Sequence, residues 1–293
     1  MRHELSGVLA IDKPAGVTSR RVVDAVAQAL GTKAVGHAGT LDPLATGVVV
    51  VCVGHATKLV DFIHQVSKHY EATFLLGRSS PSDDLETPVT EEDRPRRPSR
   101  AEVEATLPAL RGDILQRPCD YSAVHVDGKR AYALARKGRQ VALAAKPVRI
   151  HRLEITAYDW PRLGLAIECS SGTFVRAIGR DLAAALGTTA VMESLVRTAV
   201  GPFSVRRALP LDGAAPAAIR AAVLPPLAAV AHLPRIDLSG ERLDLAVRGG
   251  LLDCDLAPAA AIAACDEAGM LVGILQRHET GRYRLRPNFH GAG

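Results

Sequence analysis

The sequence predicts an α+β fold with a small β-rich part at the C-terminal end. Segments with strand and helix patterns are mixed along the chain, without the strict strand–helix alternation of a parallel α/β protein. The 293 residues are 47% hydrophobic and 23% charged, which suffices for one large domain or two unequal ones. The tail mixes short strands with glycine turns. We therefore expect one domain over residues 1–233 and a second over 234–293.

The first expected elements are a strand, a helix and a second strand. The apolar run at 7–11 predicts a short strand. A helix follows, with Thr18 or Ser19 as its N-terminal cap and Gly31 suited to the C-terminal cap. Its apolar stripe consists of Val22, Val23, Val26, Ala29 and Leu30. The apolar run at 47–53 predicts a buried strand.

The middle of the chain continues with a helical pattern at 55–65 and a strand at 70–76. One face of that strand is formed by Tyr70, Ala72, Phe74 and Leu76. Residues 77–100 are polar and rich in proline, which predicts a loop, and a helix is expected near 100–110.

The second half of the chain predicts paired strands, another helix and a strand-rich tail. Residues 147–158 and 163–169 have the pattern of two paired strands. A helix over about 173–186 ends at Gly187, where the glycine suits its C-terminal cap. Residues 205–235 are rich in alanine and proline with helical stretches, and the tail contains the strand-like runs MLVGILQ and RYRLRP.

Charge and cysteine content limit the classes of partner. The net charge of +5 favours a polyanionic partner only mildly, and a basic protein without one fits it equally well. The five cysteines lie far apart, so neither a zinc site nor a disulfide framework is indicated. The N-terminal region lacks the apolar stretch of a signal peptide, and no apolar run approaches the roughly 20 residues of a membrane helix. We expect a soluble cytoplasmic protein that does not bind membranes.

The segment GHAGTLDPLATG, residues 36–47, places one carboxylate among three glycines, two threonines and a proline. An apolar run suited to a buried strand follows directly, so Asp42 lies in a loop that leads into the core. A charged group there is costly unless it has a partner or a chemical task. Asp42 is therefore the first candidate for a functional residue.

The helix at 173–186 contains an arginine that can partner Asp42. The apolar stripe of this helix leaves Arg176 and Arg180 together on a neighbouring face. Both arginines can be solvated, and Arg176 in the first turn opposes the helix dipole at a cost of about 0.3–1 kcal/mol. Alternatively, Arg176 reaches inward, keeps the carboxylate ionised and fixes its direction. The second interpretation predicts an ion pair between Asp42 and Arg176.

Two other residues allow both a structural and a functional interpretation. Tyr70 is either a core residue with a locally satisfied hydroxyl or a platform on which a base stacks. His37 is either a surface histidine or a residue of the site. The remaining histidines of this region match no ligand pattern, and no metal site is expected: His55, His64 and His69.

The segments GVLAIDKPAGVTS and GHAGTLDPLATGVVV resemble the two N-terminal motifs of the TruB family of tRNA pseudouridine synthases. The resemblance continues in the same order through KHYEATFLLG, RGDILQRPCDYSAVHVDGKRAYALARKG, CSSGTFVRAIGRDLAAALG and LVRTAVGPF. The tail is similar to a PUA-like domain. The resemblance implies the pseudouridine synthase fold, in which a mixed, mainly antiparallel central sheet is flanked by helices, with a PUA-like RNA-binding domain at the C-terminal end.

The resemblance also implies roles for the matching residues. Asp42 would be the essential carboxylate that attacks the target uridine, and Arg176 would pair with it. Tyr70 would stack on the flipped base and could take the proton from the ring carbon that forms the new bond. The remaining implied residues support the loop, line the pocket or bind the substrate: Lys13 and Pro14 behind the loop, His37 in the space that the uridine vacates, Leu195 in the pocket wall, and Gly39, Thr40 and Phe174 at the substrate.

One implied position departs from the family pattern. The family leads us to expect tyrosine at 174, where this chain has Phe174. The ring can still pack on the base or on Asp42, but any hydrogen bond from that hydroxyl is lost.

The implied reaction is the isomerisation of the T-loop uridine of elongator tRNAs, at tRNA position 55, to pseudouridine. The bond from the uracil nitrogen to the ribose breaks, and the base rejoins through carbon. Neither a redox change nor net group transfer occurs, so no cofactor or metal is expected. The sequence leaves open whether Asp42 attacks a carbon atom or abstracts a proton. The base must leave its stack at a cost of a few kcal/mol, and the three glycines would let the backbone approach RNA closely.

The expected partner is the T-arm and elbow of tRNA, bound by a monomeric enzyme. Candidate phosphate contacts are Lys129, Arg130, Arg136, Lys137 and Arg139, although this run is equally well explained as a solvated helix face. Two other functions stay open. One is a tRNA-folding chaperone that needs no catalysis. The other is an aspartate-dependent phosphatase, although no second acidic residue follows closely in sequence on Asp42 to ligate magnesium.

Overall fold

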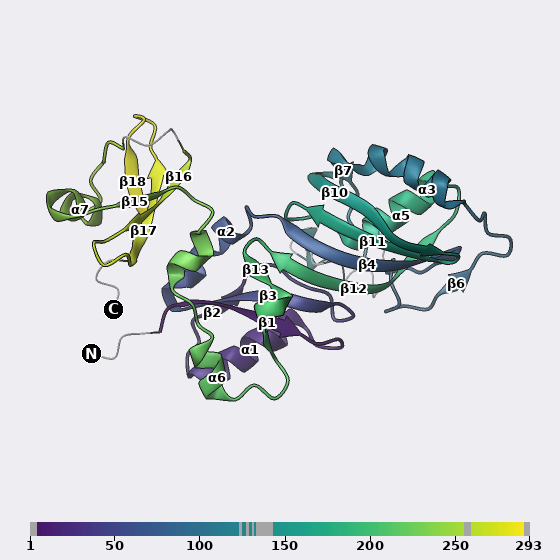
Figure 1. Ribbon diagram of the computed structural model, residues 1–293, viewed down its shortest axis with the longest axis horizontal. Coiled ribbons are helices and arrows are strands. Elements are labelled where there is room, and N and C mark those ends of the chain that lie inside the picture. Colours follow the sequence, from purple (N-terminus) through teal and green to yellow (C-terminus); the bar gives the residue numbers. More distant parts are fainter. Residues whose placement is uncertain are drawn as a thin grey trace.

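The computed structural model describes residues 5–122, 125–126, 129–130, 132, 143–254 and 259–289. A large mixed sheet forms the body of the molecule, and a smaller sheet built from the C-terminal residues lies at one end of it, coloured yellow in Figure 1. Helices pack on both sheets. The α+β class predicted from the sequence is confirmed.

The large sheet has the strand order β14-β1-β3-β12-β4-β11-β10-β7, with β2 paired to β3 and β13 paired to β12. Its strands are β1 (Gly7–Lys13), β2 (Val35–His37), β3 (Thr46–Val53), β4 (Lys68–Leu76), β7 (Gly112–Gln116), β10 (Lys146–Asp159), β11 (Arg162–Cys169), β12 (Ala190–Val200), β13 (Phe203–Ser204) and β14 (Leu209–Pro210). In the described residues, β1 with β14 and β3 with β12 are parallel, and the other pairs of this sheet are antiparallel. The sheet is therefore mixed and mainly antiparallel, as expected.

Both faces of the large sheet are covered, as the alternation along β3 shows. Val49 and Val51 belong to one apolar core, together with α1 (Ser19–Leu30), α3 (Arg100–Thr106) and α5 (Val175–Ala185). Val48 and Val50 belong to a second core on the opposite face. The second core is completed by the 3₁₀ turn η1 (Gly54–Leu59), the short helix α2 (Val60–Ile63) and the 3₁₀ turn η4 (Pro226–Val230). A loop that enters β3 therefore leads into the middle of the protein.

The caps of α1 follow the sequence. The Thr18 side chain accepts a hydrogen bond from the Arg21 amide, and Gly31 ends the helix with a φ of 68° in the left-handed region. The other described helical segments of the body are the 3₁₀ turn η2 (Leu107–Leu110), the 3₁₀ turn η3 (Val205–Arg207) and the helix α6 (Pro216–Ala221).

Several elements were not anticipated, β12 and α7 among them, and one segment expected to be a loop contains a hairpin. β12 lies at the centre of the large sheet, between β3 and β4, yet its sequence mixes Glu193 and Arg197 with apolar residues and shows no clear period. α7 (Gly240–Val247) lies in the tail, where only strands were expected. The polar segment 77–100 contains the hairpin β5 (Arg78–Ser79) and β6 (Thr90–Glu91).

The C-terminal sheet has the order β15 (Arg235–Asp237), β16 (Ala261–Cys265), β17 (Leu271–Arg277) and β18 (Tyr283–Asn288). Its inner side joins the second core of the body. Leu271 and Ile274 belong to the same apolar cluster as Phe62 of α2 and Val230 of η4. The small sheet is thus attached to the body by buried apolar contacts as well as by the chain itself.

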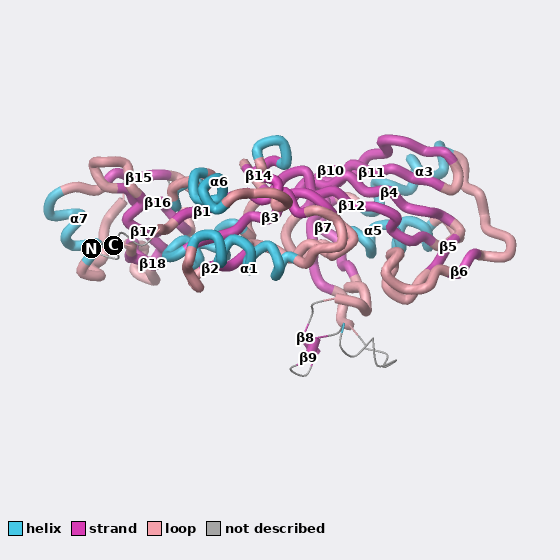
Figure 2. The backbone as a smooth tube through the Cα atoms, turned by 90° about the horizontal axis from the view of Figure 1, so that it is seen from below, coloured by secondary structure: helices cyan, strands magenta, loops and turns pink. Residues whose placement is uncertain are grey.

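A short hairpin, β8 (His125–Val126) with β9 (Lys129–Arg130), projects away from the large sheet in Figure 2. The side chains of Lys129 and Arg130, and the whole of Arg136, Lys137 and Arg139, lie outside the described residues, so their assignment as phosphate contacts stays a prediction. None of the described helices is both long enough and apolar enough to cross a bilayer.

Candidate active site

Asp42 lies in the loop between β2 and β3, and hydrogen bonds on both sides of it hold the backbone. The Ser19 hydroxyl, in the first turn of α1, accepts from the Leu41 amide at 2.8 Å and donates to the Leu41 carbonyl at 3.1 Å. The Gly16 amide donates to the Pro43 carbonyl at 2.7 Å. Ser19 was one of the two residues expected to cap α1. It instead fixes the loop, and Thr18 caps the helix.

Lys13 supports the loop from behind, as the resemblance implied. Its side chain is fully buried at the end of β1, and its Nζ donates to the carbonyls of Pro14, Val17 and Pro43 at 2.9, 2.7 and 3.3 Å. Burial lowers the pKa of Lys13 to about 8, although the charge of Asp42 acts in the opposite direction. The ammonium thus joins the backbone that follows β1 to the backbone directly after Asp42.

Arg197 holds the other end of the loop, and sequence reasoning missed it. It is 1% exposed on β12. Its guanidinium donates to the carbonyls of Val48, Thr40 and Gly39 at 2.7, 3.2 and 3.1 Å. The available signal was a lone charge within the otherwise apolar run of LVRTAV, which is unusual for a buried strand.

The glycines of the loop have different tasks. Gly47 has a φ of +102°, and a Cβ there would lie 2.3 Å from the carbonyl oxygen of Arg197. Gly47 therefore lets β3 lie against β12, and the expectation that all three glycines serve the approach of RNA is wrong for this one. A Cβ at Gly36 would meet no described atom within 4 Å, so that position faces open space.

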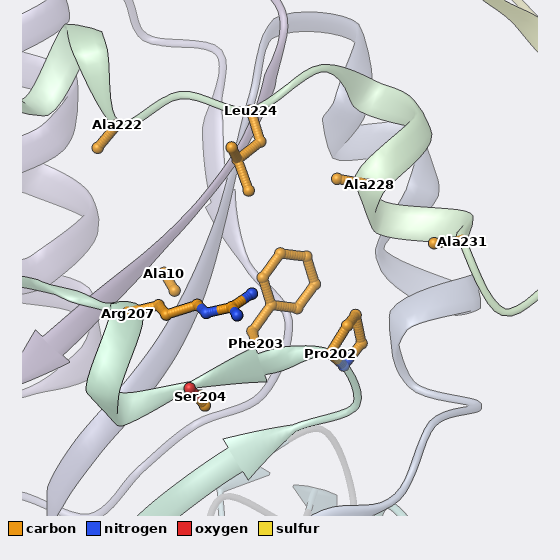
Figure 3. A pocket seen from close by; sticks show the side chains of 9 residues that line it. All are labelled: Ala10, Pro202, Phe203, Ser204, Arg207, Ala222, Leu224, Ala228 and Ala231. Atoms are coloured by element: carbon orange, nitrogen blue, oxygen red, sulfur yellow. The ribbon is translucent and has the colours of Figure 1, made fainter.

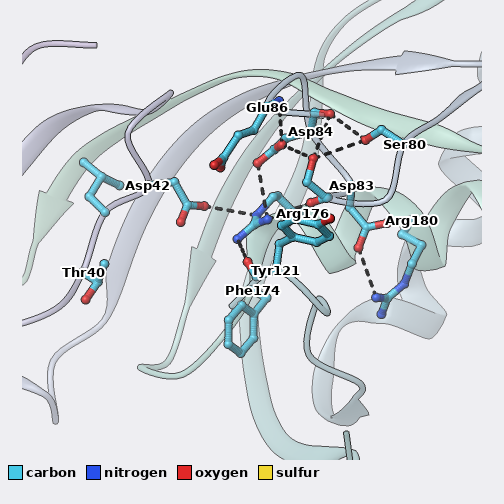
Figure 4. A network of polar contacts seen from close by, with 12 residues as sticks. Thr40, Asp42, Ser80, Asp83, Asp84, Glu86, Tyr121, Phe174, Arg176 and Arg180 are labelled. Atoms are coloured by element: carbon cyan, nitrogen blue, oxygen red, sulfur yellow. Dashed lines mark hydrogen bonds and ion pairs between the residues drawn. The ribbon is translucent and has the colours of Figure 1, made fainter. Parts of the chain in front are cut away.

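The ion pair expected from the sequence is present (Figure 4). Nε of Arg176, in the first turn of α5, lies 3.1 Å from Oδ2 of Asp42. The arginine side chain is 5% exposed and that of Asp42 is 33% exposed. Of the two interpretations of Arg176, the structure shows the inward one.

The two other nitrogens of the Arg176 guanidinium, Nη1 and Nη2, also have partners. Nη1 lies 3.3 Å from Oδ2 of Asp84 and donates to the Ser82 carbonyl at 2.7 Å, while Nη2 donates to the Tyr121 carbonyl at 2.9 Å. Burial alone would lower the pKa of Arg176, but the neighbouring carboxylates, Asp42 foremost, raise it above its ordinary value. The cation beside Asp42 is therefore permanent and fixed in direction.

Asp84 is a second site residue that sequence reasoning missed. It lies in the segment expected to be a polar loop, yet its side chain is 1% exposed. It also accepts from the Ser82 hydroxyl and, at 2.9 Å, from the Glu86 amide. The closely spaced polar residues Ser82 to Glu86 were the only local signal, because the burial itself depends on Arg176 from a distant helix.

Tyr70 is buried on β4, on the core face predicted for it. Its register partner on β12 is Arg197, and Leu195 lies opposite Ala72 on the same two strands. Burial raises the pKa of the Tyr70 phenol; the charge of Arg197 opposes this shift, and the charge of Asp42 adds to it. The phenol is therefore within electrostatic range of Asp42.

Three further predicted residues lie on β12, at the start of α5 and on β2, and in the described part of the chain none of them has a hydrogen bond or ion pair with Asp42. Leu195 is 5% exposed in the core that contains Tyr70. Phe174 is half-buried at the start of α5, where the Gln116 side chain bonds its amide at 2.8 Å and its carbonyl at 3.1 Å. Half-buried His37 ends β2 rather than lying in a loop, and burial lowers its pKa.

Comparisons with known proteins identify the family. The family model described as TruB family pseudouridylate synthase, N-terminal domain, matches residues 27–175. The tRNA pseudouridine synthase B of Mycobacteroides abscessus is 41% identical over 293 residues, covering 96% of this chain and 97% of that protein. The chain belongs to the TruB family. The protein of the same name from Dinoroseobacter shibae is 43% identical over 242 residues, covering 81% and 79% of the two chains.

Solved structures agree with the fold of this TruB family member. A Cbf5-Nop10-Gar1 complex contains a chain with a TM-score of 0.74 at 23% identity, covering 97% of this chain and 84% of that one. An H/ACA RNP bound to a substrate RNA containing 2'-deoxyuridine gives 0.72 at 21% identity, with the same coverage. At this identity the likeness concerns the fold alone. The pseudouridine synthase fold implied by the sequence is confirmed, and the chain is an RNA pseudouridine synthase.

Two cavities of the TruB family member lie outside this centre. The larger, of about 430 Å³, is mostly apolar and includes Ala10, Phe203 and Arg207 (Figure 3). The other, of about 310 Å³, is lined by Asp12, Lys13 and neighbours. Neither is lined by Asp42. In the described residues, no group of three or more histidine, cysteine or acidic side chains is arranged to hold a metal ion.

The geometry gives the TruB family member a carboxylate that is charged, oriented and partly shielded from water. Oδ2 of Asp42 is bound to Arg176, and in the described part of the chain no hydrogen bond reaches Oδ1. An oriented carboxylate with a free oxygen can act as a nucleophile or as a base. Because the surrounding dipoles and charges are already in place, little reorganisation is needed when a substrate enters.

Proposed function

We propose that this enzyme converts the T-loop uridine of elongator tRNAs, at tRNA position 55, to pseudouridine, with Asp42 as the essential carboxylate. Support for tRNA as the substrate comes from the names of the relatives, one of which matches 96% of the chain. The observation that carries the proposed mechanism is the 3.1 Å ion pair between Asp42 and buried Arg176. It provides the charged and directed carboxylate that a cofactor-free attack requires.

In the proposed reaction, Asp42 attacks an electron-poor carbon of the substrate and the bond from N1 of uracil to C1′ of the ribose breaks. The base turns, C5 bonds to C1′ as the bond to Asp42 breaks, C5 loses its proton, and N1 takes up a proton in exchange. Tyr70 stacks on the base and takes that proton, while Arg176 keeps Asp42 ionised. Because no atom is gained or lost overall, the substrate and product are isomers.

The base must leave its stack to reach Asp42, at a cost of a few kcal/mol. Three side chains around the centre offset this cost in the proposal. Leu195 forms the wall of the pocket, His37 fills the space that the base vacates, and the Phe174 ring packs on the base without a hydroxyl. Gly39 and Thr40 border the substrate with their backbone, which Arg197 already holds.

The proposal assigns residues 1–233 to a catalytic domain and 234–293 to a PUA-like RNA-binding domain that contacts tRNA beyond the T-arm. One copy of the chain supplies both Asp42 and Arg176, which supports a monomeric enzyme. The first described strand of the C-terminal sheet begins at Arg235, directly after the proposed boundary.

The test uses purified full-length protein and unmodified elongator tRNA. Mass spectrometry of cyanoethylated tRNA fragments locates pseudouridine, and filter binding measures tRNA affinity. We expect Asp42→Asn to form no pseudouridine but to bind tRNA as the wild type does. Asp61→Asn is the matched control, because that side chain is 96% exposed and its ion pair with His64, at 3.9 Å, lies away from Asp42 in sequence. Turnover by Asp42→Asn, or wild-type product at another position, would contradict the proposal.

Complementation separates catalysis from a chaperone role. A strain that lacks its own T-loop pseudouridine synthase receives either the wild type or Asp42→Asn, and its fitness is measured in competition with a normal strain. Full rescue by Asp42→Asn would mean that binding and refolding of tRNA are what the cell requires. If the wild type restores fitness and Asp42→Asn does not, the fitness gain depends on the formation of pseudouridine.

A further inference from the structure

The cavity of about 430 Å³ lies on the other face of the large sheet from the candidate active site (Figure 3). Tyr70 and Leu195 belong to the core that also contains residues of α1 and α5, whereas Phe203, which lines the cavity, belongs to the second core. Ala10 of β1, another lining residue, packs against the second core as well. A base bound at Asp42 therefore cannot occupy this cavity, and a ligand of the cavity is a separate molecule.

Backbone contacts hold the walls of the cavity in place. The Leu224 amide donates to the Val8 carbonyl at 2.8 Å, and the Val8 amide donates to the Leu224 carbonyl at 3.0 Å. A Cβ on Gly7 would lie 2.2 Å from the Leu224 carbonyl oxygen, so the segment after α6 lies directly against β1. On the other wall, Phe203 of β13 pairs with Val200 of β12. The cavity is therefore largely pre-formed, as small-molecule sites usually are.

The lining of the cavity is mostly apolar, with two polar side chains. Besides Phe203 and Leu224, the apolar part includes four alanines, whose short side chains leave the space open: Ala10, Ala222, Ala228 and Ala231. The polar side chains are Arg207 of η3 and Ser204 of β13. In the described part of the chain, neither of these two side chains has an ion pair or a hydrogen bond. The cavity thus contains a cation whose donors are unused.

We propose that this cavity binds a small amphipathic monocarboxylate, with its apolar body between Phe203 and Leu224 and its carboxylate on Arg207. An apolar cavity with one cation is complementary to an apolar molecule with one negative charge. The forked donors of the guanidinium fit the two oxygens of a carboxylate, and the Ser204 hydroxyl can donate a further hydrogen bond. The volume of about 430 Å³ lies within the range of roughly 300–1,000 Å³ that small-molecule sites have.

The exposed surface around the cavity favours a small molecule over a protein partner. Among the lining residues, Leu224 alone is an exposed large hydrophobic residue, at 46%. A stable protein interface covers roughly 800 Å² on each partner and has an apolar centre. The other exposed large hydrophobic residues that the structure describes do not line the cavity: Leu85, Val89, Leu115, Leu245 and Met270. One exposed leucine beside a cavity is too small a patch for such an interface.

Calorimetric titration of the full-length protein with octanoate tests the proposal. We expect saturable binding of one octanoate per chain, and no comparable binding of octylammonium, which has the same apolar tail and the opposite charge. Arg207→Gln should weaken octanoate binding about 10-fold, because one charge-assisted contact at an exposed arginine is lost. No saturable binding of octanoate, equal affinity for octylammonium, or unchanged affinity in Arg207→Gln would each overturn the proposal.

The neighbouring arginine provides the matched control. Arg206 precedes Arg207 on η3 and is exposed, but it does not line the cavity. Arg206→Gln removes the same charge from the protein as Arg207→Gln does, so a general loss of attraction for anions would affect both variants equally. We expect Arg206→Gln to bind octanoate as the wild type does. An equal loss of affinity in the two variants would refute a specific role of Arg207 and with it the proposal.

NMR of the wild type locates the bound octanoate. The methyl resonances of Ala222 and Leu224 should shift when octanoate is added, and those of Leu115 and Leu245, which are exposed elsewhere, should not. Shifts confined to Leu115 or Leu245 would show adsorption to the outer surface and would overturn the proposal. Ala228→Leu fills part of the cavity and should abolish binding, and a folded variant that binds octanoate normally would overturn the proposal. If this variant does not fold, the wild-type shifts decide.

The proposal goes beyond the proposed function and is tested apart from it. Neither the titration nor the NMR experiment contains tRNA. We expect Asp42→Asn to bind octanoate with wild-type affinity, because Asp42 does not line the cavity. A wild type that binds octanoate but forms no pseudouridine would refute the proposed function alone, and an active wild type without octanoate binding would refute this inference alone.

Discussion

Replacement of Arg176 by lysine keeps a positive charge near Asp42 but removes the planar set of donors that the site uses. Three nitrogens of Arg176 meet four oxygens: the carboxylates of Asp42 and Asp84 at 3.1 and 3.3 Å, and two carbonyls at 2.7 and 2.9 Å. A lysine offers its three N–H bonds from one point. It cannot satisfy acceptors spread around a fork, and we expect the partly exposed Asp42 to lose its contact first.

The size of the effect follows from that single contact. A hydrogen bond to a charged group contributes about 1.5–3 kcal/mol, so its loss in the transition state slows the reaction roughly 10- to 150-fold. Binding of tRNA should change little. Stability should also change little with lysine, because Asp84 keeps a cation. With Arg176→Ala, buried Asp84 loses its counter-charge, and the free energy of unfolding should fall by about 3–5 kcal/mol.

Single-turnover formation of pseudouridine measures the rate, and urea unfolding measures stability. Arg180→Lys is the matched control: it lies on the same helix, one turn further, and pairs with Asp181 at 2.9 Å and Asp83 at 3.4 Å. Its rate should stay near that of the wild type. A folded Arg176→Lys enzyme with a rate within about 3-fold of the wild type would refute the argument that the fork geometry directs Asp42.

Three further substitutions test the residues that support the site by urea unfolding, and the last of them is tested by turnover as well. Burial lowers the pKa of Lys68 to about 8, whereas the unfolded chain keeps this proton up to the ordinary pKa of 10.5. The free energy of unfolding of the wild type should therefore contain a contribution from Lys68 that increases with pH between these two values. The Lys68→Met variant should lack this contribution. If its free energy of unfolding increases with pH as steeply as that of the wild type, the sign argued here is wrong. Gly47→Ala sets a Cβ 2.3 Å from the Arg197 carbonyl oxygen and should cost at least about 2 kcal/mol; a neutral result would mean that β3 and β12 can separate. Ser19→Ala leaves the buried Leu41 amide without its acceptor and should cost about 1–3 kcal/mol, with slower turnover; full activity would show that the loop holds without it.

The features that the sequence predicts well are those whose signals lie close together in the chain. Thr18 and Gly31 mark the two ends of α1, and the structure uses both as caps. Alternation placed Tyr70 on the buried face of β4. The position of the Arg176 side chain was harder to predict, because the pattern of its helix also allows a solvated arginine. The inward position was favoured because the charge of Asp42 needed a partner.

The features that the sequence did not predict depend on contacts between distant segments. Asp84 reads as part of a polar loop because nothing near it shows that Arg176 will cover it. Arg197 disturbs the pattern of β12 because its charge is satisfied by carbonyls of a loop far along the chain. α7 has a usable start at Ser239 and a glycine after its end, but the strand-like runs nearby favoured an all-strand tail.

The apolar join between the C-terminal sheet and the body bears on attempts to shorten the protein. A truncation after residue 233 would remove Leu271 and Ile274, which pack in the same cluster as Phe62 and Val230. The remaining fragment would then expose an apolar patch to solvent. We expect such a fragment to aggregate at the concentrations used in the laboratory. A minimal enzyme therefore calls for polar replacements at Phe62 and its neighbours before the cut is made, whereas a label belongs at a solvent-facing turn such as Gly281.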